Sequence, residues 1–450
     1  MNLKNIHNVY FVGIGGIGMS ALARYFKFNN KNVAGYDKTK TELTNALEAL
    51  GIQVSTNDNI AEIPAEYLHK ENTIIIYTPA IPSTHSELTY FRQHNFSIYK
   101  RAEILGVITE DTYCLGVAGT HGKTTTSSIL GHLLAESETS VTAFLGGIAE
   151  NYNSNLILKG NEITVVEADE FDRSFLQLSP DIACITSMDA DHLDIYGEKE
   201  ALHDSFIEFT QRIKPNGKLF VQEDIQLDGI TYGFKETSDY YVKNISIKNG
   251  AYLFDIVTPF KIIEDIQFHL PGRHNLLNGL VAFAMAETIG TPTDRLARAL
   301  GTFKGVQRRF SYQIKTDDFV FIDDYAHHPT EINALHQAVR EMYPEKKVTA
   351  IFQPHLFSRT KDFAAEFAES LAQFDEIILL EIYPAREKPI EGITSSWLLN
   401  KIKNDQKQLL TKENLIDHIT NIKTDVLVTV GAGDIGAEVL KIKNRLTVEH

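Results

Sequence analysis

Short apolar runs alternate with helix-like amphipathic stretches along the chain. Near the N-terminus, apolar runs occupy residues 9–12, 33–34, 73–77 and 97–99, and a helix-like stretch occupies residues 19–28. Strands that alternate with helices in this way usually pair in parallel within one sheet. The pattern therefore predicts a first α/β domain over residues 1–107.

The same pattern restarts near residue 108. Apolar runs at residues 113–118, 163–166 and 182–185 predict a second sheet with helices between its strands. Short runs within residues 219–268 alternate with turns, which predicts smaller antiparallel additions to this sheet. We therefore expect a central α/β domain over residues 108–312.

A third restart follows residue 312. Strand candidates and helix-like segments alternate there as well, which predicts a C-terminal α/β domain over residues 313–450. The strand candidates are residues 319–322, 348–351, 377–380 and 426–430, and the helix-like segments are residues 331–343 and 361–373. Three domains also agree with the length, because 450 residues are too many for one ordinary core.

Composition and charge narrow the classes of function. The chain is 43% hydrophobic and has a formal net charge of −16. We therefore expect a globular protein without a nucleic-acid surface, which would need clustered Lys and Arg. Cys114 and Cys184 lie within apolar runs, which predicts two buried core residues rather than a disulfide. No apolar stretch approaches the ~18 residues of a membrane span or resembles a secretory signal, so we expect a cytoplasmic protein without a membrane partner.

The first candidate site is the glycine-rich turn after the first predicted strand. Gly13, Gly15 and Gly18 match the pattern G-x-G-x-x-G, and Asp37 ends the next predicted strand. Taken alone, these residues predict a dinucleotide site, because the glycines admit a pyrophosphate to the helix N-terminus and the acid binds a ribose hydroxyl. The alternative is a tight glycine turn without a ligand. Arg101 is either a further donor to a phosphate or sugar or a residue that caps a helix.

The second candidate site is a lysine-containing loop between a predicted strand and a predicted helix. Its residues are Gly119, Thr120, His121, Gly122, Lys123, Thr124 and Thr125. Val117 occupies the position of the first glycine in the general P-loop pattern, so only the shorter form is present. The glycines still admit phosphate oxygens to backbone N–H groups, Lys123 supplies positive charge, and Thr124 offers a hydroxyl to Mg²⁺. We therefore predict a site for the phosphates of ATP.

Acidic residues follow two of the strands predicted for the central domain. Glu167 ends one strand, and Asp189, Asp191 and His192 follow the next. Because α/β sheets place ligands at the carboxyl ends of their strands, Glu167 is predicted to hold or bridge to magnesium. His192 is a borderline ligand that binds the ion or orients a bound water. The alternative for Asp189 and Asp191 is that they are solvated acids at the start of a helix.

Ten short motifs follow one another in an order that resembles a known family. They are GIGGIGMS, GTHGKTT, EADE, DADHLD, LPGRHNLLN, GVQRRF, DDYAHHPTE, FQPHLFSRT, YPAREKPI and VGAGDIG. With these motifs the chain resembles, over essentially its whole length, the muramyl-peptide ligases of bacterial cell-wall synthesis. The resemblance implies an N-terminal Rossmann-like domain for a UDP-sugar, a central P-loop-type, ATPase-like domain with a mixed sheet, and a C-terminal Rossmann-like domain that closes over the reactants.

The resemblance also implies roles for individual residues. At the first loop, the diphosphate of a UDP-sugar replaces the dinucleotide. The residues expected to bind this UDP-sugar are Gly15, Gly16, Gly18, Met19, Ser20, Asp37 and Arg101. The residues expected at ATP, besides the loop at 119–125, are His274, Asn275, Arg309 and Asp324. Without the resemblance, Asn275 would be interpreted as a helix cap.

The metal site and the acceptor site are implied in the same way. Thr124, Glu167 and His192 would hold Mg²⁺, and the catalytic residues would be Lys123, Glu167 and His192. In the third domain, one group of residues is expected to contact the incoming amino acid or to act in domain closure. These residues are Tyr325, His327, His328, His355 and Arg359.

The activity that the resemblance implies is ATP-dependent amide formation. The motifs are most similar to those of the members that join L-alanine to the lactyl carboxylate of UDP-N-acetylmuramate through an acyl phosphate, with release of ADP and phosphate. ATP and Mg²⁺ are therefore the expected cofactors, and a monomer or homodimer is expected. Some members carry Arg where this chain has Leu356, so Arg359 or Arg386 is expected to take over the role of that side chain. The alternative for Arg386 is a surface salt bridge.

Three other functions are alternatives. A sibling ligase that adds a different amino acid or a preformed peptide would carry the same nucleotide motifs. An NAD-dependent oxidoreductase is supported by the first loop and Asp37 alone, and it leaves Lys123 unexplained. A non-catalytic sensor of nucleotide-sugar and ATP would not need the predicted metal ligands.

Overall fold

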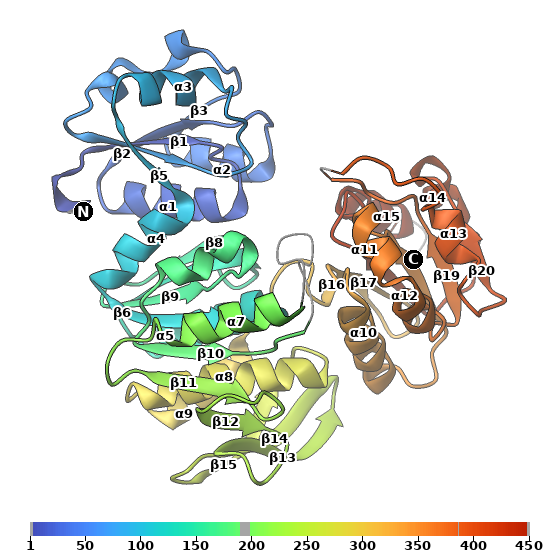
Figure 1. Ribbon diagram of the computed structural model, residues 1–450. Helices are drawn as coiled ribbons and strands as arrows, with labels where there is room; N and C mark the ends of the chain where they lie inside the picture. The colour runs from blue at the N-terminus through green and yellow to red at the C-terminus, as the bar shows by residue number, and fades with distance from the viewer. Residues whose placement is uncertain (1–2, 190–198, 386, 448–450) are drawn as a thin grey trace. The chain divides into compact units, whose positions relative to one another are not determined.

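The computed structural model describes residues 3–189, 199–385 and 387–447. The chain divides into two compact units (Figure 1). The first unit comprises Met1–Lys243, Asp255–Ile266 and Asn278–Phe303, and the second comprises Asn244–Phe254, Gln267–Leu277 and Lys304–His450.

The N-terminal sheet is parallel throughout, as the alternation of strands and helices predicts. Its order is β3-β2-β1-β4-β5, and Val9 in β1 pairs with Val33 in β2 and Ile74 in β4. The strands are β1 (Asn8–Val12), β2 (Asn32–Tyr36), β3 (Gln53–Ser55), β4 (Thr73–Tyr77) and β5 (Ser97–Lys100). The helices are η1 (Leu3–Asn5), α1 (Ile17–Phe28), α2 (Glu42–Ala49), η2 (Ile60–Glu62), η3 (Ala65–Leu68), α3 (Ser86–Gln93) and α4 (Arg101–Glu110).

The central sheet contains the strands predicted for the second domain. Its order is β15-β14-β13-β12-β11-β10-β6-β9-β7-β8. The strands are β6 (Tyr113–Ala118), β7 (Val141–Ala149), β8 (Ser154–Leu158), β9 (Ile163–Glu167), β10 (Ile182–Ile185), β11 (Lys218–Gln222), β12 (Ile230–Gly233), β13 (Tyr240–Lys248), β14 (Ala251–Val257) and β15 (Ile262–Phe268). The helices are α5 (Lys123–Glu136), η4 (Phe171–Gln177), α7 (Lys199–Thr210), α8 (Arg273–Thr288) and α9 (Thr293–Thr302).

Strands β10 to β13 correct one expectation from the sequence. The strands that begin at Lys218, Ile230 and Tyr240 were expected to be antiparallel additions, but β10–β11, β11–β12 and β12–β13 all pair in parallel. Successive side chains of a strand alternate between its two faces whichever way the neighbouring strand runs. The pattern of apolar residues therefore does not distinguish parallel from antiparallel pairing. The connections decide it, because parallel pairing requires α7, the segment 223–229 and the segment 234–239 each to bring the chain back to the edge of the sheet where the preceding strand began.

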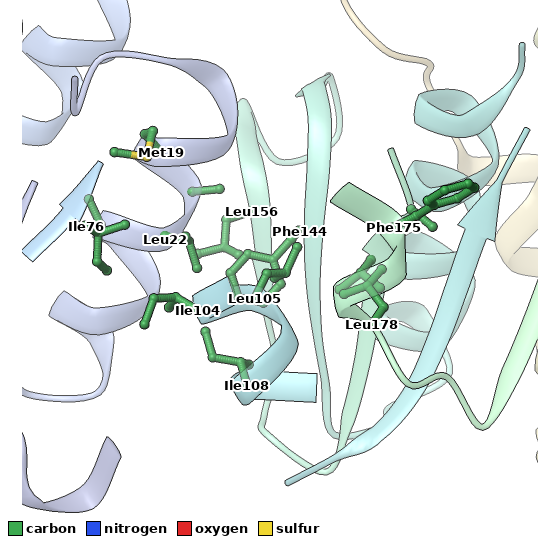
Figure 2. Packing of buried hydrophobic residues seen from close by; sticks show 14 of the residues in the cluster. Met19, Leu22, Ile76, Ile104, Leu105, Ile108, Phe144, Leu156, Phe175 and Leu178 are labelled. Atoms are coloured by element: carbon green, nitrogen blue, oxygen red, sulfur yellow. The ribbon is translucent and has the colours of Figure 1, made fainter. Parts of the chain in front are cut away.

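A continuous hydrophobic core joins the N-terminal sheet to the central sheet within the first unit. Leu22 of α1 and Leu105 of α4 pack with Phe144 of β7 and Leu156 of β8, as Figure 2 shows. Figure 1 places α1 and α4 between the two sheets, and α1 packs against both β7 and β8. The first two predicted domains therefore share buried surface.

The second unit is built on a sheet that is parallel except at one edge. Its order is β16-β17-β21-β18-β19-β20, and only the β16–β17 pair is antiparallel among its paired strands. Val320 and Ile322 pack in one core cluster and Phe321 in another, because alternate residues of a strand point to opposite faces. The strands are β16 (Ser311–Lys315), β17 (Val320–Asp324), β18 (Val348–Phe352), β19 (Glu376–Leu379), β20 (Lys407–Leu409) and β21 (Val426–Val430).

The helices of the second unit correct a second expectation. They are α10 (Pro329–Met342), α11 (Phe357–Asp362), α12 (Ala364–Leu371), α13 (Ser395–Leu399), α14 (Lys412–Ile419) and α15 (Gly436–Thr447). The single helix-like segment expected at residues 361–373 is interrupted at Phe363, which has φ −111° and ψ 26°. The Phe363 ring packs edge-on against His328, with ring centroids 4.7 Å apart. No periodic pattern encodes such a long-range contact.

Cys114 and Cys184 are both buried free cysteines, as their position in apolar runs predicts. Among the residues that the structure describes, no helix is both long and apolar enough to cross a membrane.

Candidate active site

A loop with two left-handed glycines opens helix α5. Gly119 (φ +133°) follows strand β6, and Gly122 (φ +82°) immediately precedes Lys123, the first residue of α5. A Cβ atom on Gly119 would lie 2.1 Å from Thr186 Oγ1, and one on Gly122 would lie 2.7 Å from Asn278 Oδ1. Gly119 therefore requires glycine for space as well as for backbone conformation, and Gly122 favours glycine because of its left-handed backbone. The loop delivers the chain to a helix N-terminus, the geometry that binds phosphate.

Two residues that follow strand β10, which no sequence motif indicates, support this loop. Ser187 Oγ accepts a hydrogen bond from His121 N (2.8 Å) and lies 2.9 Å from Thr120 Oγ1, and the Ser187 carbonyl accepts one from Thr120 N (3.1 Å). Thr186 Oγ1 donates to the carbonyls of Ala118 (3.1 Å) and His121. Because the N–H groups of Thr120 and His121 already bond within the protein, the first turn of α5 is the segment of the loop best placed for phosphate.

Lys123 is a largely buried cation at the start of α5. Its Nζ donates to Gly119 O (2.6 Å) and to Glu170 Oε1 (2.9 Å), and lies 2.7 Å from Glu170 Oε2. Burial by itself lowers the pKa of Lys123, but the carboxylates of Glu170, Asp169 and Glu167 outweigh this effect and hold the pKa above its ordinary value. Lys123 is therefore protonated and ordered beside the loop.

Thr124 and Glu167, two of the predicted metal ligands, are in direct contact. Thr124 Oγ1 donates to Glu167 Oε1 at 2.8 Å, which brings the second residue of α5 to the end of strand β9. His192, the third predicted ligand, and the neighbouring Asp191 lie outside the described residues. Within residues 3–189, 199–385 and 387–447, no group of three or more His, Cys, Asp or Glu side chains is arranged to hold a metal ion.

The first glycine loop is built around Asp37. Asp37 Oδ2 accepts a hydrogen bond from Gly15 N at 2.7 Å, so this carboxylate anchors the loop itself. Ser20, which is predicted for the UDP-sugar, is buried in the first turns of α1. Its hydroxyl donates to Ile17 O (3.0 Å) and accepts from Asn155 Nδ2 (2.8 Å). Asp37 and Ser20 therefore both have structural roles at this loop.

One pocket of about 330 Å³ joins the first glycine loop to the acidic end of strand β9. Residues from both sides line it, among them Gly16, Gly18, Met19, Arg101, Glu167 and Asp169. Arg101 Nη2 lies 3.8 Å from Asp169 Oδ2. A Cβ on Gly146, which also lines the pocket, would lie 2.1 Å from Glu167 Oε2, so the absence of a side chain there leaves room for that carboxylate. Residues predicted for the UDP-sugar and a residue predicted for the metal therefore face the same cavity.

Residues predicted for ATP and residues predicted for closure lie near the carboxyl end of strand β17 in the second unit. Asp324 is the last residue of β17, and its carboxylate accepts two backbone hydrogen bonds of 2.7 Å each. Burial raises the pKa of Asp324 to about 6, although Arg309 opposes the shift. The guanidinium carbons of Arg308 and Arg309 lie 5.0 and 5.1 Å from the ring centroid of Tyr325. Tyr325 thus contacts two cations through its ring.

The predicted histidines of the second unit have different environments. His327 Nδ1 lies 3.3 Å from Glu331 Oε2, and its ring centroid is 6.1 Å from that of His355. His355 Nδ1 in turn lies 3.4 Å from Nη1 of Arg359, which is only 8% exposed. His328 instead caps helix α10 with its side chain. The structure therefore groups His327, His355 and Arg359 but gives His328 a structural role.

His274 and Asn275 lie within the first turn of α8, because the helix begins at Arg273 rather than after the pair. Asn275 Nδ2 donates to Pro271 O at 2.6 Å, so Asn275 is not the plain N-cap suggested by the sequence.

Leu356, where some family members carry Arg, is buried and has φ +71°. Of the two arginines expected to take over that role, Arg359 lies near His355, and Arg386 lies outside the described residues.

Comparison with known proteins identifies the family. The model described as "Mur ligase family, catalytic domain" matches residues 8–113, "Mur ligase middle domain" matches 117–286, and "Mur ligase, glutamate ligase domain" matches 308–433. A Flavobacterium psychrophilum protein named UDP-N-acetylmuramate–L-alanine ligase is 62% identical over 446 residues, covering 99% of each chain. The chain belongs to the Mur ligase family.

Further comparisons agree with this membership. A Flavobacterium johnsoniae protein of the same name is 60% identical, again over 99% of each chain. The crystal structure of UDP-N-acetylmuramate-alanine ligase from Thermotoga maritima has a TM-score of 0.83 at 27% identity, covering 98% of this Mur ligase and 100% of that one. The resemblance seen in the ten motifs is confirmed, as is the three-domain α/β fold. The domain limits 1–107, 108–312 and 313–450 and the assigned site residues stay predictions.

Proposed function

We propose that this Mur ligase joins L-alanine to the lactyl carboxylate of UDP-N-acetylmuramate, with conversion of ATP to ADP and phosphate. The main support for the proposal is one pocket that is lined by Gly16, Gly18 and Met19 as well as by Glu167. A UDP-sugar anchored at the first glycine loop would extend toward Glu167, and Glu167 binds Thr124 of the phosphate loop. The names of the relatives that are about 60% identical support the same reaction.

The chemistry explains why a phosphate loop is needed. A carboxylate is a poor electrophile, because its negative charge repels nucleophiles and it has no good leaving group. Transfer of the γ-phosphoryl group from ATP to a carboxylate oxygen gives an acyl phosphate and ADP. The amine of L-alanine then attacks the acyl carbon, loses a proton, and expels phosphate to leave the amide. Lys123, protonated beside the loop, would stabilise the charge that spreads over the transferring phosphoryl oxygens.

The donor set around the loop fits a magnesium ion. Thr124 Oγ1 and Glu167 Oε1 are hard oxygen donors 2.8 Å apart, and Mg²⁺ prefers oxygen ligands. We assign Thr124 and Glu167 as ligands, with His192 as the third. Bound there, Mg²⁺ would neutralise charge on the phosphate oxygens. The catalytic residues in this proposal are Lys123, Glu167 and His192.

The second unit supplies the remaining proposed contacts. Arg309, Asp324, His274 and Asn275 are assigned to ATP. The residues assigned to the amino acid and to domain closure are Tyr325, His327, His328, His355 and Arg359, of which His328 would act through its cap on α10. We further assign the protein to the cytoplasm, where ATP is available, and propose a monomer or homodimer.

A ligation assay tests the proposed reaction. The protein is incubated with UDP-N-acetylmuramate, ATP and Mg²⁺, and phosphate release is measured with L-alanine, glycine, L-serine or a preformed peptide as acceptor. We expect the fastest release with L-alanine. A clear preference for a peptide or another amino acid would reassign the protein to a sibling activity within the family.

Lys123→Ala tests the role of the phosphate loop. We expect this variant to lose ligation by a factor of at least about 10², because an oriented charge at the transferring phosphoryl is removed. Binding of UDP-N-acetylmuramate should be unchanged, since Lys123 does not line the pocket. Lys159→Ala, at an exposed lysine of the same unit, is the matched control. Near-normal ligation by Lys123→Ala would contradict the assignment.

A further inference from the structure

The EADE segment makes two side-chain contacts with the start of helix α5, and the proposed function uses only one of them. Glu167 at the end of β9 accepts a hydrogen bond from Thr124. Glu170, three positions further along, immediately precedes η4 and binds Lys123. One short segment therefore holds two neighbouring residues of the phosphate loop.

The contact between Glu170 and Lys123 involves both carboxylate oxygens. Lys123 Nζ lies 2.9 Å from Oε1 and 2.7 Å from Oε2, and it also donates to Gly119 O at 2.6 Å. The Glu170 side chain has no solvent exposure, and that of Lys123 is 12% exposed. An ammonium group has three N–H donors. The carboxylate and the loop carbonyl together therefore fix where the charge of Lys123 lies.

Stability alone does not explain a buried pair at this place. Removing an ammonium and a carboxylate from water has a large cost, and apolar residues of similar volume often stabilise a core equally well. An apolar pair, however, would bring no positive charge to the phosphate loop. The buried Glu170 carboxylate offsets the cost of keeping Lys123 charged where little water reaches it.

We propose that Glu170 is a positioning residue for ligation, which holds the Lys123 ammonium at the loop before ATP binds and while the γ-phosphoryl group is transferred. This inference rests on the proposed function. Glu170 acts through Lys123 and does not itself contact the reacting atoms. Because Lys123 faces charge that develops most fully in the transition state, loss of Glu170 should lower kcat more than it raises KM for ATP.

Two substitutions distinguish the effect of the Glu170 charge from the effect of where its carboxylate lies. Glu170→Gln keeps the size and one acceptor oxygen but removes the charge, and we expect kcat to fall roughly 100-fold with KM for UDP-N-acetylmuramate unchanged. Glu170→Asp keeps the charge on a shorter side chain, and the flexible lysine stem should follow it and recover part of the lost kcat. Glu162→Gln, at an exposed glutamate of the same unit, should match the unsubstituted protein.

A double-mutant cycle shows whether Glu170 acts through Lys123. The kcat for ligation and, by calorimetry, the affinity for ADP with Mg²⁺ are measured for Lys123→Ala, Glu170→Gln and the double variant. We expect Glu170→Gln to have no further effect once Lys123 is absent, because residues that act as a unit are not additive. Additive effects on kcat, or a kcat of Glu170→Gln within about twofold of the unsubstituted protein, would overturn the inference.

Two further outcomes are decisive. If Glu170→Gln no longer binds UDP-N-acetylmuramate, the pair is needed for folding rather than for positioning, and the inference is overturned. If the unsubstituted protein itself does not ligate, the proposed function fails. In that case the cycle in ADP affinity still decides whether Glu170 positions Lys123.

Discussion

At the scale of the residue, the candidate site depends on which backbone N–H groups of the phosphate loop already form hydrogen bonds within the protein. The sequence identifies Gly119, Gly122 and Lys123 correctly as a loop that opens a helix. It does not reveal that Ser187 accepts hydrogen bonds from the backbone N–H groups of Thr120 and His121. Fewer residues of the loop are therefore available to bind phosphate than the motif contains, and these residues lie at the first turn of α5.

A buried carboxyl group in the N-terminal domain gives a prediction at the same scale. Glu87 on α3 has no solvent exposure, and Tyr10 Oη donates to its Oε2 at 3.0 Å. Burial raises the pKa of Glu87 from 4.5 to about 7. Between these pH values the folded protein holds a proton at Glu87 that the unfolded chain releases, so the contribution of Glu87 to stability falls as the pH rises through this window.

Glu87→Gln should remove this pH dependence. The amide oxygen can still accept the hydrogen bond from Tyr10, and no charge has to be buried. We therefore expect the variant to be more stable than the unsubstituted protein at pH 8, by on the order of 2 kcal/mol, and nearly equal to it near pH 4.5. Thermal unfolding at both pH values measures the difference. Glu66→Gln, at an exposed glutamate, is the control, and a variant that is less stable at pH 8 would contradict the prediction.

At the scale of the element, the ends of three neighbouring strands build the site. Strands β6, β9 and β10 are adjacent in the central sheet, and their carboxyl ends carry the phosphate loop, Glu167 and the Thr186–Ser187 pair. The apolar runs predict all three strands. Their adjacency is decided by parallel pairing, which sets Val117 beside Glu167 and Ala118 beside Ile185.

Ser187→Ala tests the support that β10 gives to the loop. The substitution leaves the N–H of His121 without the side-chain acceptor at 2.8 Å, a loss of roughly 1–2 kcal/mol. We expect KM for ATP to rise roughly tenfold, while KM for UDP-N-acetylmuramate does not change. Steady-state kinetics with each substrate varied in turn measures this. Ser83→Ala, on an exposed loop, is the control, and equal effects on both substrates would contradict a local role.

At the scale of the whole molecule, the chain has two compact units with separate cores. The N-terminal and central sheets share one core in the first unit, where Leu22, Phe144 and Leu156 pack together (Figure 2). The single tryptophan of the chain, Trp397, packs against a core of the second unit. Tryptophan fluorescence therefore reports on the second unit, whereas circular dichroism reports on both.

Leu156→Ala should separate these two signals. The side chain is 5% exposed, and its truncation should destabilise the first unit by about 2–4 kcal/mol. We expect the circular dichroism transition to move to lower temperature while the fluorescence transition of Trp397 stays unchanged. Leu440→Ala, at a leucine that is 62% exposed, should change neither signal. An equal shift of both signals after Leu156→Ala would mean that the units unfold together.

The sequence by itself determined the types of most elements, both glycine loops and the family. These features follow from neighbouring residues, because apolar periodicity and glycine conformation act over a few positions. The tertiary structure alone decided the direction of β11 to β13, the use of Ser187 by the loop and the pairing of Glu170 with Lys123. Lys123 and Glu170 are 47 positions apart and His121 and Ser187 are 66 apart. Contacts over such separations depend on which strands become neighbours, and no local pattern carries that information.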